Sequence, residues 1–165
     1  MKKITQVISA MVNYYSGDPK RVGHFMKVYS FAKTIGEAEN LDERTQEILE
    51  IAAATHDIGI KISEQKYNSS AGKHQEHEGP AQAEKMLLSL DVERSVIDRV
   101  MFLIAHHHTY EDVNGMDYRI LIEADFLVNA YEDNLSKDAI KKAKDVIFRT
   151  ETGTKFLDDI FALDD

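Results

Sequence analysis

The chain has 165 residues, and its 20 Lys and Arg against 29 Asp and Glu give a net charge of −9. This length favours one domain, which we expect to span residues 1–165, because a single helical core of this size can fold without staples. The acidic charge disfavours nucleic acid as a partner. The absence of cysteine excludes disulfides and thiolate metal sites.

The start of the chain carries no sign of export. Residues 1–11 alternate polar and apolar side chains with helical period and lack the continuous apolar core of a signal peptide. No run approaches the roughly 20 apolar residues that span a membrane. We therefore expect a cytoplasmic protein without a membrane partner. The sequence does not determine the oligomeric state, and a homodimer is compatible with it.

Helical periodicity accounts for the first third of the chain. One helix is predicted over residues 3–15, a second begins with Asp18 as N-cap and Pro19 in its first turn, and a third runs from residue 40 or 42 to just before Gly59. Residues 61–76 are polar, rich in turn formers and without period. They predict a long loop, which is either a functional lid or simply mobile.

Five further helices are predicted after this segment. They cover about residues 79–90, 91–107, 117–133, 136–149 and 154–162, with a polar loop over 109–117. The stretch from Val100 to Ala105 is apolar all round, which predicts a buried central helix. No alternating β-branched run lies between turn residues. The predicted fold class is therefore all-α.

Two titratable residues end the third helix on a face that should point inward. His56 is in line with Leu49 and Ala52, and Asp57 follows it directly. A charged carboxylate in a core is costly unless it is paired or bound to a metal. Taken alone, the pair His56-Asp57 is explained as well or better by a core histidine whose hydrogen bonds are satisfied within the protein.

Asp125 and His24 also lie on apolar stripes. Asp125 stands between Leu121 and Val128 at helical spacing, whereas Glu123 can point to water. His24 begins an inward stripe of apolar residues on the second helix. For Asp125, capping of a neighbouring helix or pairing with an arginine is the alternative explanation.

Four more histidines gather at helix ends. His106, His107 and His108 end the most buried helix, and His77 opens another. The triplet is compatible with a solvated helix tip, yet at least one of its rings should follow the core face inward. Neutral imidazole and carboxylate are the ligands that Zn, Fe, Mn and similar ions use. Inward His and Asp residues on several separate helices therefore predict a metal site.

The order of these residues resembles the HD-domain superfamily of metal-dependent phosphohydrolases. Its motif, H…HD…D, corresponds to His24, His56-Asp57 and Asp125, and the resemblance spans about residues 20–135, the core of the expected domain. The chain lacks the Gly-Tyr-Pro signature of cyclic-di-GMP phosphodiesterases after its His pair. It looks closest to small stand-alone bacterial members, including those that cleave diadenosine tetraphosphate.

The resemblance implies a single HD-domain helical bundle that holds one or two divalent ions, with Fe, Mn, Ni, Co, Zn and Mg as candidates. The implied ligands of the first ion are His24, His56, Asp57 and Asp125. In two-metal members Asp57 would bridge the ions, and His77 together with His107 or His108 would hold the second.

The implied activity is hydrolysis of a phosphoester or phosphoanhydride in a small-molecule nucleotide by a metal-activated water. Asp57 would hold the metal and accept a proton from that water. Candidate contacts to the substrate are Lys61, Arg21, Lys73 and Thr109, with His106 as a further candidate at the leaving group. In many family members a Lys is found at the fourth position after the His, where this chain has Ile60, so Lys61 is shifted by one residue.

Two other classes of protein compete with the enzyme. One is an HD module that binds a metal or nucleotide as a sensor or scaffold without turnover. The other is a helical structural protein with a buried polar network and no metal. The complete ligand set favours the enzyme over the module, and elemental analysis of the purified protein would distinguish the structural protein.

Overall fold

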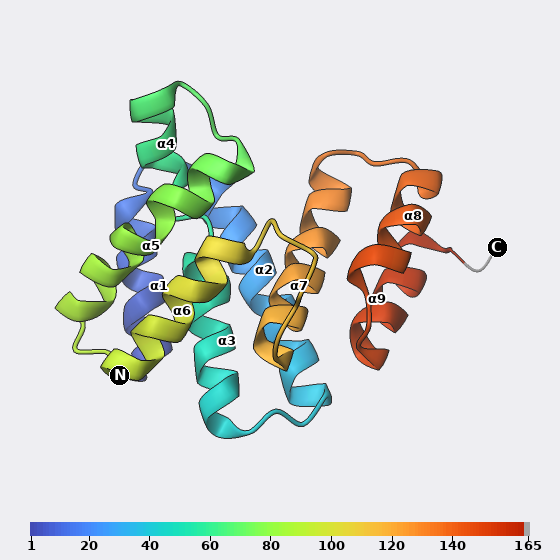
Figure 1. Ribbon diagram of the computed structural model, residues 1–165, viewed down its shortest axis with the longest axis horizontal. Helices are drawn as coiled ribbons and strands as arrows, with labels where there is room; N and C mark the ends of the chain where they lie inside the picture. The colour runs from blue at the N-terminus through green and yellow to red at the C-terminus, as the bar shows by residue number, and fades with distance from the viewer. Residues whose placement is uncertain (164–165) are drawn as a thin grey trace.

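The chain folds as an assembly of α-helices in the computed structural model, which describes residues 1–163. Within that range there are nine helices and no β-strand, so the predicted all-α class is confirmed (Figure 1). The helices are α1 Lys3–Tyr14, α2 Pro19–Ala38, α3 Glu43–Thr55, α4 Ile60–Tyr67, α5 Gly72–Ser89, α6 Arg94–His106, α7 Met116–Glu132, α8 Lys137–Ile147 and α9 Glu151–Phe161.

Local capping explains where the two helices that lead into the site begin. The Asp18 carboxylate accepts a hydrogen bond from the Arg21 backbone N–H at 3.1 Å, with Pro19 in the first turn of α2, as predicted. The Asp42 carboxylate likewise accepts from the Thr45 N–H at 2.9 Å and starts α3. These caps set the phase of both helices and thus which side chains point inward.

The long loop predicted over residues 61–76 is wrong. Residues 60–67 form α4, α5 begins at Gly72, and only residues 68–71 connect them. Contacts between the two helices stabilise the pair: the Tyr67 hydroxyl donates to Glu78 at 2.7 Å, and the Tyr67 ring stacks on His74. Because α4 buries only Ile60 and Ser63, its sequence has almost no apolar period to detect.

The centre of the molecule is α3, which packs against α1, α2, α6 and α7 (Figure 1). Residues 51–56 at its end are fully buried. Helix α7 is also buried along most of its length, and α2 contacts both. The three helices therefore meet in the interior at the level of His56.

The C-terminal helices α8 and α9 form a pair on the outer side of α7 (Figure 1). Glu123, which the sequence placed toward water, is instead fully buried beneath this pair. Its carboxylate accepts hydrogen bonds from the Thr150 hydroxyl at 2.8 Å and the Thr150 N–H at 3.2 Å. Burial raises the pKa of Glu123 to about 7, because water no longer solvates the charge.

The raised pKa of Glu123 predicts a stability that depends on pH. The folded state favours the protonated carboxyl of Glu123. The contribution of this group to stability is therefore complete below its ordinary pKa of 4.5 and is lost as the pH rises to about 7. Glu123→Gln keeps an acceptor for Thr150 and removes the charge. We compare the free energy of unfolding of the variant with that of the wild type, measured by urea unfolding. Between pH 4 and pH 8 this difference should shift in favour of the variant by up to about 3 kcal/mol. The exposed variant Glu111→Gln should show no such trend, and equal trends in both would contradict the assignment.

A glycine contact fixes how closely α5 approaches the end of α3. A Cβ on Gly59 would lie 2.8 Å from the Gln75 carbonyl oxygen and the Gly79 nitrogen, both backbone atoms that cannot rotate away. We expect Gly59→Ala to destabilise the fold by about 1–3 kcal/mol in denaturant unfolding. Gly23→Ala is the matched control, since nothing lies within 4 Å of its Cβ. Because Gly23 lies inside helix α2, Gly23→Ala should raise the free energy of unfolding by about 0.5–1 kcal/mol. An unchanged stability of Gly59→Ala would show that the helices can separate freely.

Candidate metal centre

Four side chains from three separate parts of the chain converge in the interior. His24 Nε2 lies 3.1 Å from Asp57 Oδ2 and 3.2 Å from Asp125 Oδ1. His56 Nε2 lies 3.3 Å from the same oxygen of Asp57 and 3.2 Å from that of Asp125. The two Nε2 atoms are themselves 3.2 Å apart. Two imidazoles and two carboxylates thus point at one small volume.

The other ring nitrogens of both histidines are already engaged. His56 Nδ1 donates to the Ala53 carbonyl oxygen at 2.7 Å, and His24 Nδ1 donates to the Glu132 carboxylate. With protons on both Nδ1 atoms, a neutral ring presents the lone pair of Nε2 to the cluster. Such outer hydrogen bonds are the arrangement that orients histidine ligands toward a metal.

The charge balance of the cluster calls for a cation. Burial alone would lower the pKa of His24, but the carboxylates of Asp125 and Asp57 raise it to about 10. Burial would raise the pKa of Asp125, yet the charge of His56 holds it well below its usual range. Burial would also raise the pKa of Asp57, but the charge of His56 holds that pKa well below its usual range, so both carboxylates are ionised and attract a cation.

Unpartnered polar atoms support the fit of a metal ion to these residues. Asp125 Oδ1 and His107 Nε2 are buried, and neither makes a hydrogen bond of good geometry, although two histidine nitrogens lie 3.2 Å from Asp125 Oδ1. Buried polar atoms normally make such a bond, and an absent ion is among the reasons for an exception. Divalent ions take ligand atoms of these kinds. The residues of the cluster thus fit a divalent metal ion.

A second group of possible ligands adjoins the first through Asp57. His107 Nε2 lies 3.6 Å from Asp57 Oδ1, while its Nδ1 donates to the Ile104 carbonyl oxygen at 2.7 Å. Asp57, His107 and His108 have ligand atoms within 4.8 Å of one another. Burial lowers the pKa of His108 to about 4, so its ring is neutral at pH 7. Asp57 therefore has one oxygen toward each group.

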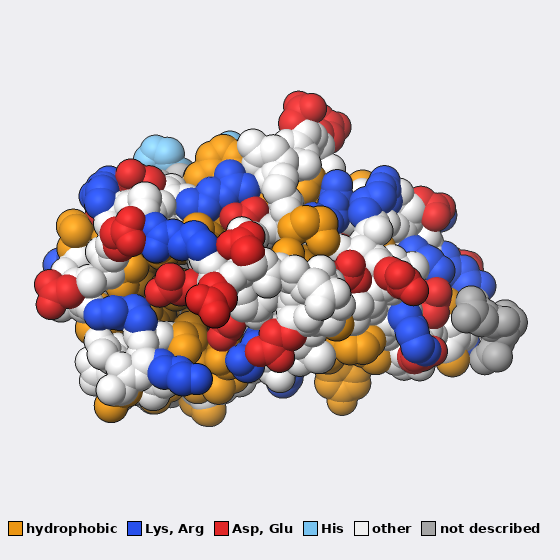
Figure 2. All heavy atoms as spheres, turned by 90° about the horizontal axis from the view of Figure 1, so that it is seen from below, with side chains coloured by type: hydrophobic (Ala, Val, Ile, Leu, Met, Phe, Trp, Pro, Cys, Tyr) orange, Lys and Arg blue, Asp and Glu red, His pale blue; other side chains and the backbone are white. Residues whose placement is uncertain are grey.

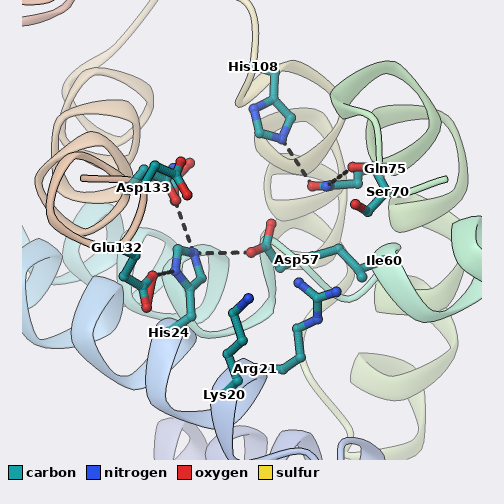
Figure 3. Close-up of a pocket in the computed structure, with 12 residues that line it drawn as sticks. Lys20, Arg21, His24, Asp57, Ile60, Ser70, Gln75, His108, Glu132 and Asp133 are labelled. Atoms are coloured by element: carbon teal, nitrogen blue, oxygen red, sulfur yellow. Dashed lines mark hydrogen bonds and ion pairs between the residues drawn. The ribbon is translucent and has the colours of Figure 1, made fainter. Parts of the chain in front are cut away.

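The cluster forms the floor of a cavity of about 240 Å³. In Figure 3, Lys20 and Arg21 from the start of α2 lie on one side of Asp57, and Gln75 and His108 lie on the other. The remaining wall comes from the end of α7 and consists of Asn129, Glu132 and Asp133. Ser70 and Ile60 complete the lining. The cavity therefore joins a candidate metal site to a cationic rim and an oxygen-rich rim.

Several residues singled out from the sequence lie away from this cavity. The side chain of His77 is 77% exposed and its Nδ1 contacts Glu78 at 3.3 Å. The Lys61 ammonium donates to the Tyr14 carbonyl oxygen at 3.2 Å and covers the Tyr14 ring. Lys73 is exposed outside the cavity lining. The structure thus does not bring these three side chains to the cluster.

Thr109 and His106 likewise face elsewhere. The Thr109 hydroxyl donates to Glu76 at 3.2 Å, and His106 donates through Nδ1 to the Phe102 carbonyl oxygen while its ring stacks on Phe102. Of the residues proposed from the sequence, the structure brings the following to the cluster or its cavity: His24, His56, Asp57, Asp125, His107, His108 and Arg21.

Sequence reasoning missed several residues of the cavity wall. Asn129, Glu132 and Asp133 follow Asp125 by four, seven and eight positions, so helical spacing from that aspartate could have found them. Lys20 precedes His24 by four positions in the same way. Gln75, whose Oε1 lies 3.0 Å from His108 Nε2, was hidden in the segment expected to be a loop.

The fold and the cluster together define an all-α protein with a buried His–Asp site able to hold a divalent ion. The HD domain family matches residues 21–147, and the chain therefore belongs to that family, as the resemblance of its motif predicts. No helix in residues 1–163 combines the length and hydropathy of a membrane span.

A solved structure supports the same fold. A protein described as a predicted HD superfamily hydrolase, from an uncultured Thermotogales bacterium, superimposes with a TM-score of 0.69 at 23% sequence identity. The match covers 96% of this chain and 84% of that chain. No curated protein matches the sequence significantly.

Proposed function

We propose that this protein is a metal-dependent phosphohydrolase that cleaves a phosphoester or phosphoanhydride bond in a nucleotide. The observation that carries the proposal is the position of the His–Asp cluster at the floor of a cavity whose rim holds Lys20 and Arg21. A site that joins divalent-metal ligands to side-chain cations is suited to an anionic phosphoryl group.

Each residue of the cluster has a part in this proposal. His24, His56, Asp57 and Asp125 would hold the ion, and two imidazoles in the set favour Mn, Fe, Co, Ni or Zn over Mg. When bound, such an ion polarises a phosphoryl oxygen and lowers the pKa of a water toward neutrality. Asp57 directs Oδ1 toward His107 and the second group, where this oxygen can accept a proton.

The cationic rim would bind the phosphate. Arg21 forms an ion pair of 2.6 Å with Glu64, which orients its guanidinium at the rim. Lys20 lies one turn before His24 on the same face of α2 and points into the cavity in Figure 3.

Replacement of Lys20 tests this part of the proposal. We expect Lys20→Ala to raise KM for a phosphoester about five- to tenfold with a smaller change in kcat, since a ground-state phosphate contact is lost. Lys73→Ala is the matched control, because Lys73 is exposed away from the cavity. Equal KM values for the wild type and Lys20→Ala would remove Lys20 from the binding site.

Metal removal and return tests the activity itself. Protein stripped with a chelator should lose hydrolysis of nucleoside mono-, di- and triphosphates, and one of Mn, Fe, Co, Ni or Zn should restore it. Elemental analysis gives the metal content of the same samples. Protein that takes up metal and binds nucleotide without turnover would instead support the binding module, and protein that takes up no metal would refute the proposal.

A further inference from the structure

Nearly all the residues that line the cavity above the cluster have polar or charged side chains, which bears on what the cavity can recognise. Among its lining residues Ile60 is the one hydrophobic side chain, and no Phe or Tyr belongs to the lining. Nucleobases are usually held by stacking on aromatic side chains or by apolar surface. The cavity offers neither of these to a base.

The two aromatic rings of the hollow next to the cavity already have partners within the protein. This hollow shares Arg21 with the cavity and contains Tyr14 and Tyr15. The Lys61 ammonium lies over the Tyr14 ring, 4.9 Å from its centroid. Tyr15 is 5% exposed, and its hydroxyl donates to the Asp57 carbonyl oxygen at 2.7 Å. The Tyr15 ring is therefore buried, and Lys61 occupies one face of the half-buried Tyr14 ring.

Positively charged side chains and side chains with oxygen acceptors lie on different sides of the cavity. Lys20 and Arg21 form the cationic side, whereas Asn129 and Asp133 offer oxygen acceptors at the end of α7. Figure 3 shows Asp133 across the cavity from Gln75. A ligand that matches this pattern has a phosphate at one end and hydroxyl donors a few bonds away.

The size of the cavity also favours a small ligand of this kind. Its volume of about 240 Å³ lies below the range of roughly 300–1,000 Å³ found for pockets that enclose drug-sized ligands. A phosphorylated sugar is smaller than such a ligand. A nucleotide that places its phosphate and sugar here would leave its base outside.

From these observations we infer that the site recognises a phosphoryl group together with a small polyhydroxylated moiety, the sugar, and does not discriminate among nucleobases. The inference rests on the proposed function, since it concerns the substrate of the same site. Asp133 and Asn129 would accept hydrogen bonds from the sugar hydroxyls, while Glu132 is already engaged by His24 and Lys27.

A substrate comparison on the metal-loaded protein tests the inference. We expect kcat/KM for the four 5′-mononucleotides and for ribose 5-phosphate to agree within about tenfold. A preference of more than about 100-fold for one base, or a ribose 5-phosphate value more than about 100-fold below the nucleotides, would overturn it. If metal-loaded protein hydrolyses none of these compounds and no other phosphoester, the proposed function has failed instead.

A pair of variants tests the role given to the end of α7. Asp133→Asn should lower kcat/KM for ribose 5-phosphate by about fivefold or more, while leaving that for phenyl phosphate, which has no hydroxyl groups, unchanged. Asp145→Asn, an exposed change on α8, is the control and should alter neither. An equal loss on both substrates would show that Asp133 does not contact the sugar.

Discussion

Asp57→Ala is expected to remove bound divalent metal and to lower phosphoester hydrolysis by at least about 1,000-fold. Asp57 is the residue that adjoins both groups of possible ligands, since its Oδ2 faces His24 and His56 and its Oδ1 faces His107. Its loss removes a negative charge and a ligand from the first group and the shared carboxylate from the second, so both groups lose affinity for a divalent ion. Elemental analysis and steady-state kinetics on the same preparation measure the two effects.

Two controls separate this result from a loss of structure. Asp145→Ala removes an exposed aspartate of α8 and should change neither metal content nor rate. Circular dichroism of Asp57→Ala should retain the helical signal, because the change leaves the apolar residues through which the helices pack intact. Retention of both metal and activity in a folded Asp57→Ala protein would refute the metal centre.

The elements that could be predicted from sequence are those determined by local signals. The start of α2 follows from a capping aspartate and a proline, and the inward faces of α2, α3 and α7 follow from helical period. Because His24, His56 and Asp125 lie on those faces, their convergence could be anticipated once the helices were assumed to pack against one another.

The residues that could not be predicted depend on contacts distant in sequence. The start of α5 at Gly72 is stabilised by contacts with α4, and this start decides that Gln75 faces the cavity and His77 faces solvent. Two positions apart on a helix correspond to about 200°, so one residue points inward when the other points outward. The sequence shows that a histidine is present at position 77, but it does not show which way that side chain points, because this depends on where α5 begins.

Glu123 illustrates the same limit on the other side of α7. Its helical neighbours Ile120, Phe126 and Leu127 are apolar, but α7 has apolar residues on several faces, and the pattern does not show that a later element covers this one. It is buried because α8 and α9 return to cover that face and place Thr150 against its carboxylate. A burial that depends on where a later helix pair packs is beyond what periodicity can indicate.

Glu132 should set the metal affinity of the site through His24. Its carboxylate accepts from His24 Nδ1, which fixes the ring so that Nε2 faces Asp57 and Asp125. The second carboxylate oxygen lies 3.4 Å from the Lys27 ammonium, which helps to hold it in place. Loss of such an outer partner typically weakens metal binding about 10–100-fold. We expect this range for Glu132→Ala, measured with Zn²⁺ in competition with a chromophoric chelator.

The size of the effect should depend on what replaces the carboxylate. Glu132→Gln keeps an oxygen that can accept from Nδ1 but loses the charge that raises the basicity of the ring, so its Zn²⁺ affinity should lie between those of the wild type and Glu132→Ala. Asp133→Asn removes a charge from the adjacent position without touching His24. If Asp133→Asn weakened Zn²⁺ binding as much as Glu132→Ala, the general negative field of the α7 terminus would be responsible. If only the Glu132 variants are affected, the hydrogen bond to His24 carries the effect, because the field is reduced by one charge in both cases.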